Sequence, residues 1–277
     1  MGIIRAMRAA FAVVLIAALA QAAPAAASPR VAELVMDART GEVLHQRDAD
    51  VRLHPASLTK MMTLYLVFEA VQQGRLSLDQ RVRVSQAAAA QPPSKIGFRP
   101  GQTAMVRDLI RAAAVRSAND AAVVLAEAVS GSEARFAELM TQRARQLGMT
   151  NTTFRNASGL TAQGHLSTAR DMAVLGRRLF HDYPQYYNLF GRRSTEAFGR
   201  NITNTNRLLG EYRGADGIKT GFTRAAGFNL VSSAERDGVR VIASLFGGSS
   251  PTARNARVAQ LMDIGFQRAG RGGPARQ

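Results

Sequence analysis

The sequence predicts an α+β fold, in which strands from both chain ends form one antiparallel sheet flanked by helices, with a mostly helical subdomain inserted between them. Residues 31–50 and 217–248 have strand composition, whereas residues 58–180 follow helical periodicity. Because strands and helices do not alternate one by one, a parallel βαβ arrangement is not expected. A chain of 277 residues can bury a core without disulfide or metal support.

The first elements after residue 30 are a hairpin and an apolar helix. Residues 31–50 contain two short apolar runs around a turn at Arg39-Thr40-Gly41, which is typical of a hairpin. Residues 58–71 are apolar almost all round, so we expect this helix at the centre of the fold, ending at Gly74.

The middle of the chain is expected to be helical. A loop rich in proline and glycine at 91–103 precedes two alanine-rich helices that only Ser117-Ala118-Asn119 separates. Residues 150–165 are irregular, and Thr168 with an acidic residue three positions on forms a weak capping box. The helices expected in this region are 106–116, 120–130, 131–149 and 167–180.

Strand composition returns in the last third of the chain. The pair Asp237-Gly238 is a strong hairpin signal between two apolar runs. A helix is expected at 252–269. The strands expected here are 217–223, 227–236 and 238–248.

The N-terminus has the pattern of an export signal. A basic start containing Arg5 and Arg8 precedes an apolar run too short to span a bilayer comfortably, and small residues follow. We expect cleavage between Ala27 and Ser28. The expected organisation is a signal peptide at 1–27, one folded domain at 28–270 and a flexible basic tail at 271–277.

The chain is strongly basic, with 36 Lys and Arg residues against 20 Asp and Glu, and arginine supplies nearly all of the excess. The arginines are scattered, without a basic helix or an aromatic-interleaved patch, so nucleic acid is not the expected partner. An anionic envelope polymer or membrane surface suits an exported protein, and a merely solvated arginine-rich surface remains an alternative. Cysteine is absent, which excludes thiol chemistry and Cys-based metal sites.

The apolar helix carries a lysine three residues after a serine at its start. Ser57 and Lys60 share one helix face, and burial of a lysine is unfavourable unless it is paired or loses its charge. A neutral lysine beside a serine hydroxyl is a general base for a nucleophile, and the helix N-terminus suits a developing oxyanion. On this motif alone, Ser57 as an N-cap and Lys60 extending to solvent remain an alternative.

Two further motifs occur in fitting contexts. Ser117-Ala118-Asn119 lies between two helices, and Lys219-Thr220-Gly221 begins a strand. Each has an ordinary structural interpretation, as a helix cap or an exposed strand end. Together with S-x-x-K they form the signature of class A β-lactamases and penicillin-binding proteins.

The sequence resembles the low-molecular-mass penicillin-binding proteins, the serine D-alanyl-D-alanine carboxypeptidases. The resemblance covers about residues 30–268 and includes the segments PASLTKMMT, SANDAAVVLAEAVSGSEARFAELM and ADGIKTGFTRAAGFNLVSSAERDGVRVIASLFGG. The middle motif is S-A-N where this family usually has S-G-N. The resemblance implies a β-lactamase/DD-peptidase-like fold with its catalytic domain at 28–270.

The resemblance also implies catalytic roles. Ser57 would attack the carbonyl of the penultimate D-alanine and form an acyl-enzyme, and Lys60 would take its proton. Ser117 would relay a proton to the departing terminal D-alanine, and Asn119 would orient Lys60 and the substrate amide.

Binding roles follow in the same way. Lys219 and Thr220 would hold the terminal carboxylate, and the charge of Lys219 would help to keep the catalytic lysine neutral. Gly221 would let the substrate backbone approach. The backbone N–H groups of Ser57 and Phe222 would form the oxyanion hole.

The expected substrate is a peptidoglycan stem peptide ending in D-Ala-D-Ala, and β-lactam antibiotics are expected as covalent inhibitors. No metal or other cofactor and no transmembrane segment in the mature chain are expected. The family's longer members add a β-rich domain and an amphipathic C-terminal helix. Residues 271–277 have no apolar face, so we expect a soluble protein of the periplasm or cell envelope.

Three other functions remain open. A D,D-endopeptidase would cut cross-links with the same motifs, and an inactive wall-binding module would share the fold. A serine β-lactamase needs an acid to activate the deacylating water, but residues 150–160 contain none and Glu138 lacks the expected sequence context. His165 is expected to be structural, and Arg224 is a weaker candidate for carboxylate binding.

Overall fold

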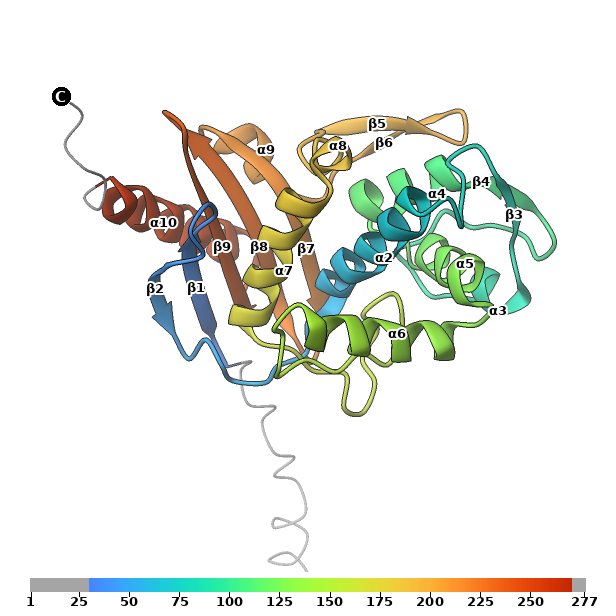
Figure 1. Cartoon of the computed structure of the whole chain (residues 1–277), viewed down its shortest axis with the longest axis horizontal. Helices are drawn as coiled ribbons and strands as arrows, with labels where there is room; N and C mark the ends of the chain where they lie inside the picture. The colour runs from blue at the N-terminus through green and yellow to red at the C-terminus, as the bar shows by residue number, and fades with distance from the viewer. Residues whose placement is uncertain (1–29, 271–277) are drawn as a thin grey trace, which may run out of the picture.

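The computed structural model describes residues 30–270, so the predicted signal peptide and basic tail lie outside the described residues. A five-stranded antiparallel sheet has the strand order β2-β1-β9-β8-β7, in which strands from the two chain ends lie side by side (Figure 1). The predicted α+β class is therefore confirmed. The strands are β1 (Ala32–Asp37), β2 (Val43–Arg47), β7 (Ala215–Thr223), β8 (Gly227–Arg236) and β9 (Val239–Gly248).

Helices cover both faces of this sheet, and a mostly helical region extends from one of them (Figure 1). The helix α10 (Pro251–Ala269) packs on one face, and α7 (Ala169–Asp182) packs on the other. The remaining helices are η1 (Ala56–Thr59), α2 (Lys60–Gln72), α3 (Gln86–Ala89), α4 (Val106–Arg111), η2 (Ala112–Arg116), α5 (Asn119–Ser130), α6 (Glu133–Gln146), α8 (Pro184–Tyr187) and α9 (Leu208–Glu211).

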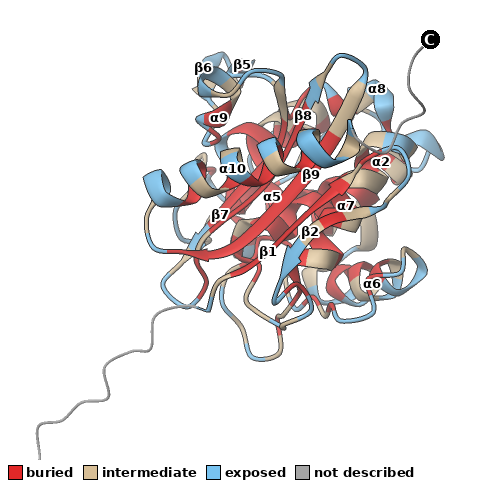
Figure 2. Cartoon of the chain, turned by 90° about the vertical axis from the view of Figure 1, so that its left-hand side faces the viewer, coloured by how far each residue is buried: buried red, intermediate tan, exposed pale blue. Residues whose placement is uncertain are grey.

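Both faces of the sheet are buried, because α7 and α10 cover them. Successive side chains of a strand point to opposite faces and so enter two different cores. On β9, Ile242 and Phe246 join the large core beneath α7 and α2, whereas Val241 and Leu245 join the smaller core beneath α10. Figure 2 shows the buried strands running under α10, whose outer side is exposed. The strands therefore read as nearly continuous apolar runs.

The predicted central helix is α2, and its buried residues lie on all sides of the helix. It contacts α5, α6 and α7, so it lies between the sheet and the helical region. None of the helices described between residues 30 and 270 is both long and apolar enough to cross a membrane.

Local signals placed most boundaries correctly. Asp237 and Gly238 both have positive φ, as a tight hairpin turn requires, and Thr168 caps α7 by accepting a hydrogen bond from the backbone N–H of Asp171. The predicted helix 106–116 is confirmed in its extent, and its second half winds into the π-helical turn η2 before Ser117. Sequence patterns missed the two-stranded sheets β3 (Arg81–Arg83) with β4 (Thr103–Met105), and β5 (Ser194–Ala197) with β6 (Arg200–Thr203).

A buried carboxylate joins α10 to the sheet. Glu33 on β1 is fully buried, and its carboxylate accepts hydrogen bonds from Arg257 of α10 and from Arg47 and pairs with His45. Burial alone would raise the pKa of Glu33, but the hydrogen bonds and positive charges outweigh it and hold the pKa below its usual value. This link fixes the helix that carries Arg254 toward the functional cleft.

We expect Glu33→Gln to lower the free energy of unfolding by about 2 kcal/mol at pH 7, since charge-assisted hydrogen bonds to a buried group are lost. The lowered pKa means that the carboxylate stabilises the fold above its unfolded-state pKa and loses this effect as pH falls through the folded value. Denaturant unfolding of both proteins at pH 7 and at low pH checks this. The exposed Glu42→Gln is the control, and an equal effect of both substitutions would contradict the prediction.

Candidate active site

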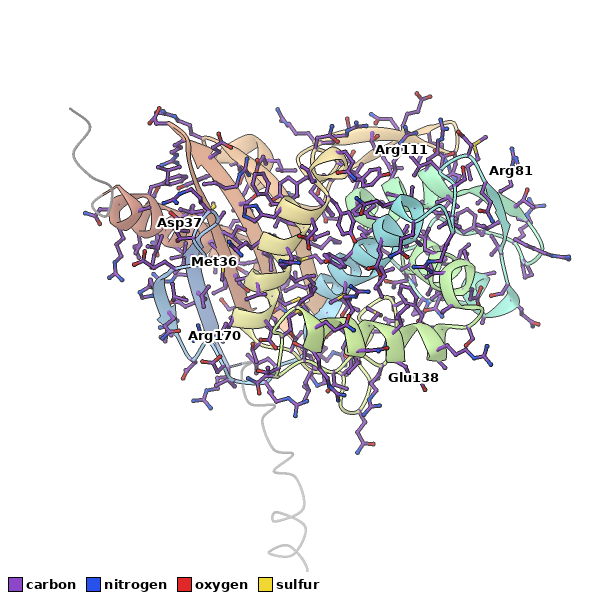
Figure 3. All side chains as sticks on the ribbon, in the orientation of Figure 1. Met36, Asp37, Arg81, Arg111, Glu138 and Arg170 are labelled. Carbon is purple, nitrogen blue, oxygen red and sulfur yellow. The ribbon has the colours of Figure 1, made fainter. Side chains whose placement is uncertain are left out.

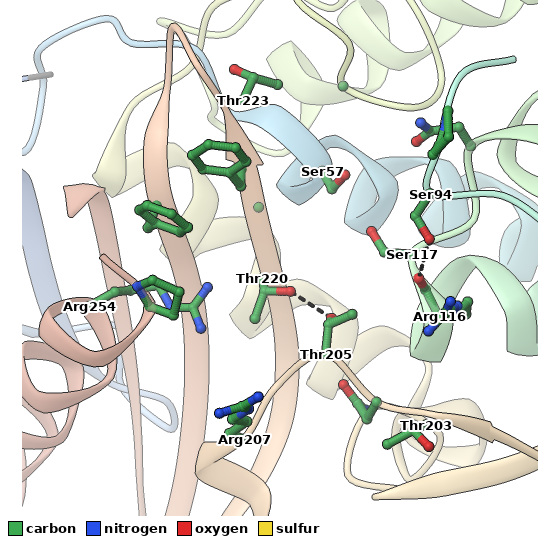
Figure 4. Close-up of a pocket in the computed structure, with 18 of the residues that line it drawn as sticks. Ser57, Ser94, Arg116, Ser117, Thr203, Thr205, Arg207, Thr220, Thr223 and Arg254 are labelled. Atoms are coloured by element: carbon green, nitrogen blue, oxygen red, sulfur yellow. Dashed lines mark hydrogen bonds between the residues drawn. The ribbon is translucent and has the colours of Figure 1, made fainter. Parts of the chain in front are cut away.

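A cleft of about 780 Å³ lies between the sheet edge at β7 and the helical region. Ser57, Ser117, Asn119 and Thr220 line this cleft, so residues far apart in the sequence meet there (Figure 4). Lys60 and Lys219 lie behind this lining, almost without solvent exposure. The structure thus brings the three sequence motifs together.

The backbone of η1 places Ser57 at the cleft. Ala56 has a positive φ of 50°, which is uncommon for a residue with a side chain. Gly221 of β7 lies so close that a Cβ there would be 3.0 Å from the Pro55 carbonyl oxygen and 3.1 Å from the Ser57 nitrogen. Asn229 of β8 donates to the Pro55 carbonyl at 3.2 Å. The strands β7 and β8 therefore hold the turn that presents Ser57.

The Lys60 amine has three hydrogen-bonding partners. Its Nζ lies 2.7 Å from Asn119 Oδ1, 2.6 Å from the Ser158 carbonyl oxygen and 3.0 Å from Ser57 Oγ. Asn119 Oδ1 and the carbonyl can only accept, so they use two N–H groups of Lys60. In a neutral amine the remaining position is a lone pair, which accepts the Ser57 hydroxyl proton.

Electrostatics favour this neutral amine. Burial is the largest effect, and the charge of Lys219 adds to it, so the pKa of Lys60 lies well below 10.5 despite an opposing effect of Asp120. Burial and the charge of Arg254 also lower the pKa of Lys219, to about 7. Burial therefore favours the neutral form of both amines, and the charge of Lys219 favours it further at Lys60.

Ser117 links the second lysine to the cleft. It has left-handed backbone angles, φ 64° and ψ 33°, at the end of the π-helical turn η2. Its Oγ accepts a hydrogen bond of 2.9 Å from Lys219 Nζ, which also donates to the Thr220 carbonyl at 3.0 Å. A strained backbone at a polar cleft residue is typical of functional positions.

The loop at 91–103 forms a wall of the cleft, and the start of α5 holds it. Asn119 donates two hydrogen bonds to this loop. Its backbone N–H bonds the Ser94 carbonyl oxygen at 2.7 Å, and its side-chain amide bonds the Pro92 carbonyl oxygen at 2.9 Å. The buried Asp120 carboxylate accepts from the backbone N–H groups of Ile96 and Gly97. Asn119 is thereby fixed for its bond to the catalytic lysine candidate.

Lys219 lies behind the cleft lining, and its contact with the substrate carboxylate stays a prediction. Its amine is buried against Ser117 and is not part of the cleft lining. Thr220 does line the cleft, and so does Arg254 of α10, whereas Arg224 is exposed outside it. Burial and the nearby Arg207 charge lower the pKa of Arg254 to about 10, so it stays charged at neutral pH. The Arg254 guanidinium is the better-placed cation.

Phe222 and Gly221 also lie in the cleft lining. The Phe222 ring is 55% exposed and stacks on Phe228 with the ring centroids 4.3 Å apart. The close approach of Gly221 to the backbone of Ser57 explains why this position has no side chain. Its contact with substrate, and the oxyanion-hole roles of Ser57 and Phe222, stay predictions.

Two residues considered as acids or bases have other surroundings. His165 is buried, with Nε2 2.8 Å from Thr59 Oγ1 and Nδ1 accepting from the backbone N–H of Arg155. Burial, with His54 and Arg155 nearby, lowers its pKa to about 4, which fits a structural role. Glu138 is exposed on the outer side of α6 (Figure 3), and so cannot act on an ester at Ser57.

Comparisons with known proteins agree with this arrangement. The family described as D-alanyl-D-alanine carboxypeptidase, peptidase S11, matches residues 18–250. This chain belongs to that family. It is 39% identical over 238 residues to D-alanyl-D-alanine carboxypeptidase DacF of Bacillus subtilis, and 39% identical over 241 residues to DacC of Escherichia coli. These matches cover 84% of this chain but only 61% and 60% of the relatives, so the chain spans about three fifths of their length.

Solved structures of the family have the same fold. Penicillin-binding protein 5 of Haemophilus influenzae matches with a TM-score of 0.82 and 33% identity, covering 88% of this chain and 73% of that one. Penicillin-binding protein D2 of Listeria monocytogenes, in its ampicillin-bound form, matches with a TM-score of 0.75 and 36% identity, covering 85% and 96%. The predicted β-lactamase/DD-peptidase-like fold is confirmed.

Sequence reasoning missed several residues of the site. Ser158 acts through its backbone carbonyl, which leaves no signal in the residue type. Arg254 is one of many arginines, and only the orientation of α10 selects it. Gly159 had a possible signal, as a glycine in an irregular segment. A Cβ there would lie 1.8 Å from the Ala56 carbonyl oxygen, so the 157–160 loop packs directly on the turn before Ser57.

We expect acylation by benzylpenicillin to rise with pH and to level off well below pH 10. A protonated Lys60 has no lone pair that can accept the Ser57 proton. Because its pKa is lowered, the neutral amine forms at a lower pH than in an ordinary lysine. Stopped-flow acylation rates across a pH series measure this, with Lys95→Ala as the matched lysine control. An ascending midpoint near pH 10 would contradict the prediction.

We expect Gly159→Ala to reduce the acylation rate at least tenfold and to lower the midpoint of thermal unfolding by at least about 5 °C. The added Cβ would overlap the Ala56 carbonyl, and the residue also has a φ of +89°. Gly164→Ala is the control, because Gly164 also has a positive φ but only the Arg155 side chain lies near it. Similar behaviour of the two variants would show that the clash is relieved without displacing Ser57.

Proposed function

We propose that the protein is a serine D-alanyl-D-alanine carboxypeptidase, which removes the terminal D-alanine from peptidoglycan stem pentapeptides and is acylated by penicillin. The observation that carries this proposal is the distance of 3.0 Å between Ser57 Oγ and the buried Lys60 Nζ, whose pKa is lowered. A serine beside a neutral amine is an activated nucleophile. Family membership supports the substrate class.

In the acylation step, Ser57 Oγ attacks the carbonyl carbon of the penultimate D-alanine while Lys60 Nζ takes the hydroxyl proton. The carbonyl oxygen becomes an oxyanion, which the backbone N–H groups of Ser57 and Phe222 are proposed to stabilise. The C–N bond then breaks. The leaving amine of D-alanine takes a proton through Ser117, whose Oγ is held by Lys219.

Water completes the reaction by hydrolysing the ester at Ser57 and releasing the shortened peptide. The terminal carboxylate of the substrate is proposed to lie against Thr220 and the Arg254 guanidinium. Thr220 Oγ1 is held 2.6 Å from Thr205 Oγ1, so its orientation is fixed. Lys219 is proposed to act on Ser117 and through its positive charge on Lys60, rather than by contacting the carboxylate directly.

The catalytic domain is proposed to comprise residues 28–270. Export to the periplasm or cell envelope is proposed from the basic start and apolar run within residues 1–27. An extracytoplasmic location is also where a peptidoglycan substrate is found.

A serine β-lactamase is the less favoured function. Fast hydrolysis of the acyl-enzyme needs a general base near the ester, and no Asp or Glu is among the described residues that line the cleft. An inactive wall-binding module is also less favoured. Burying Lys60 and Lys219 is unfavourable, and binding alone does not need buried lysines.

The test is intact mass after brief incubation with benzylpenicillin, combined with release of free D-alanine from a pentapeptide. We expect a stable adduct and D-alanine release for the native protein, and neither for Ser57→Ala. Ser94→Ala, at another serine in the cleft lining, is expected to retain the adduct. No adduct with intact antibiotic would indicate a binding module, and no adduct with destroyed antibiotic would indicate a β-lactamase.

A further inference from the structure

A second pocket lies outside the cleft, between the β5–β6 hairpin and the loop at 91–103. It has a volume of about 280 Å³ and shares only Arg116 and Thr203 with the cleft lining. None of the residues in the three catalytic motifs is in its described lining. The hairpin extends across the helical region beside α4 (Figure 1), so the pocket belongs to a part of the surface that the proposed reaction does not use.

The register of the hairpin brings a positive charge to this pocket. Its two-residue turn at 198–199 has positive φ at both positions, which is typical of a tight hairpin and fixes the pairing of Ala197 with Arg200. Because side chains alternate along a strand, Arg200 and Ile202 share the face of the buried Ala197, which packs against α4 and η2. Glu196 lies on the opposite, exposed face. The hairpin therefore directs its arginine, and not its carboxylate, toward the pocket.

Both walls of the pocket are held in place. The ring of Phe198 in the hairpin turn packs edge-to-face on Phe98 of the loop, with the ring centroids 5.2 Å apart. Arg111 of α4, which Figure 3 labels close to the hairpin, donates to the Glu196 carbonyl at 3.2 Å. The loop is fixed in turn by its backbone hydrogen bonds to the Asp120 carboxylate. The pocket is therefore formed by anchored segments before any ligand binds.

The pocket carries positive charge without compensation. Lys95, Arg116 and Arg200 are exposed in its lining, and that described lining contains no Asp or Glu. None of the three forms an ion pair with a residue between 30 and 270. Three like charges around one concave site create a positive potential that attracts anions. Arginine also binds carboxylate and phosphate groups through two parallel hydrogen bonds.

Apolar side chains lie beside these cations. Ile96, Phe198 and Ile202 are half-buried in the lining, so part of each is open to the pocket. A small inorganic anion would leave them unused, whereas a sugar ring has apolar C–H groups that pack on such a surface.

We propose that this pocket binds an acidic saccharide, a sugar unit that bears a carboxylate or a phosphate, of an anionic envelope polymer. The arginines and the lysine bind the acidic group, and the apolar side chains contact the sugar ring. The site holds such a polymer beside the cleft, and its binding does not depend on acylation at Ser57. It is therefore a function in addition to the proposed peptidase activity.

The experiment is an NMR chemical-shift titration at low ionic strength with glucose 6-phosphate, glucuronic acid, glucose and inorganic phosphate as probes. Each probe is added to the untreated protein and to protein treated with benzylpenicillin, which occupies the catalytic cleft. We expect an acidic sugar to bind both forms alike, and more tightly than glucose or inorganic phosphate.

The variants remove one cation of the pocket at a time. We expect Arg200→Ala and Lys95→Ala each to weaken binding of the acidic sugar about tenfold, because a charged hydrogen-bonding partner is lost, with partial recovery in Arg200→Lys. Arg99→Ala is the control, since it removes an exposed charge from the same loop but outside the described pocket lining. It is expected to change the affinity by less than about twofold.

Each result supports or overturns the proposal. Tighter binding of glucose 6-phosphate indicates a phosphate on the sugar unit, and tighter binding of glucuronic acid indicates a carboxylate. No binding of either acidic sugar, or inorganic phosphate binding as tightly as both, would overturn the proposal. Binding that the two alanine variants leave unchanged, or that penicillin treatment removes, would also overturn it. If the proposed function fails, with no penicillin adduct and no D-alanine release, the titration of the untreated protein still decides the saccharide site.

Discussion

The site depends on keeping one lysine amine out of water beside a serine hydroxyl. Lys60 is fully buried in the central helix α2, so its charged form is disfavoured before any partner acts on it. The partners then determine what the neutral amine can do. Asn119 and the Ser158 carbonyl occupy two N–H groups, and only the position toward Ser57 is left for a proton. The apolar helix is thus part of the chemistry as well as of the core.

Close contacts between backbone segments fix the position of Ser57. The turn before Ser57 is in contact with Gly221 on the sheet side and with Gly159 on the loop side. Gly159 has no room for a side chain, and a Cβ at Gly221 would lie only 3.0 Å from the Pro55 carbonyl oxygen. The sheet edge, the 157–160 loop and α2 therefore meet at one short turn. Because this contact is between backbones, small displacements of the sheet relative to the helical region would move the nucleophile.

The distribution of charge makes the described lining of the cleft positive. Elsewhere on the described chain many arginines pair with carboxylates, as Arg257 does with Glu33 and Arg170 does with Asp50. Among residues 30–270, the hydrogen-bond partner of the Arg254 guanidinium is the amide oxygen of Asn255, and acidic side chains are missing from the described cleft lining. The excess of positive charge in the chain is therefore unpaired at the cleft, where the described lining has arginines but no carboxylates. The exclusion of acids also removes a general base that a fast β-lactamase would need.

The sequence by itself determined the fold class, the central apolar helix, the Asp237-Gly238 hairpin and the three motifs, because periodicity, turn chemistry and residue spacing are local properties. It also predicted a functional lysine on the apolar helix, and the structure shows that Lys60 is buried. Only the tertiary structure decided that Lys219 bonds Ser117, that Arg254 reaches the cleft and that Arg224 does not. These outcomes depend on how α10 and β7 pack against distant segments. An arginine or a backbone carbonyl has no local pattern that reports which surface it will face, so such contacts are decided by packing.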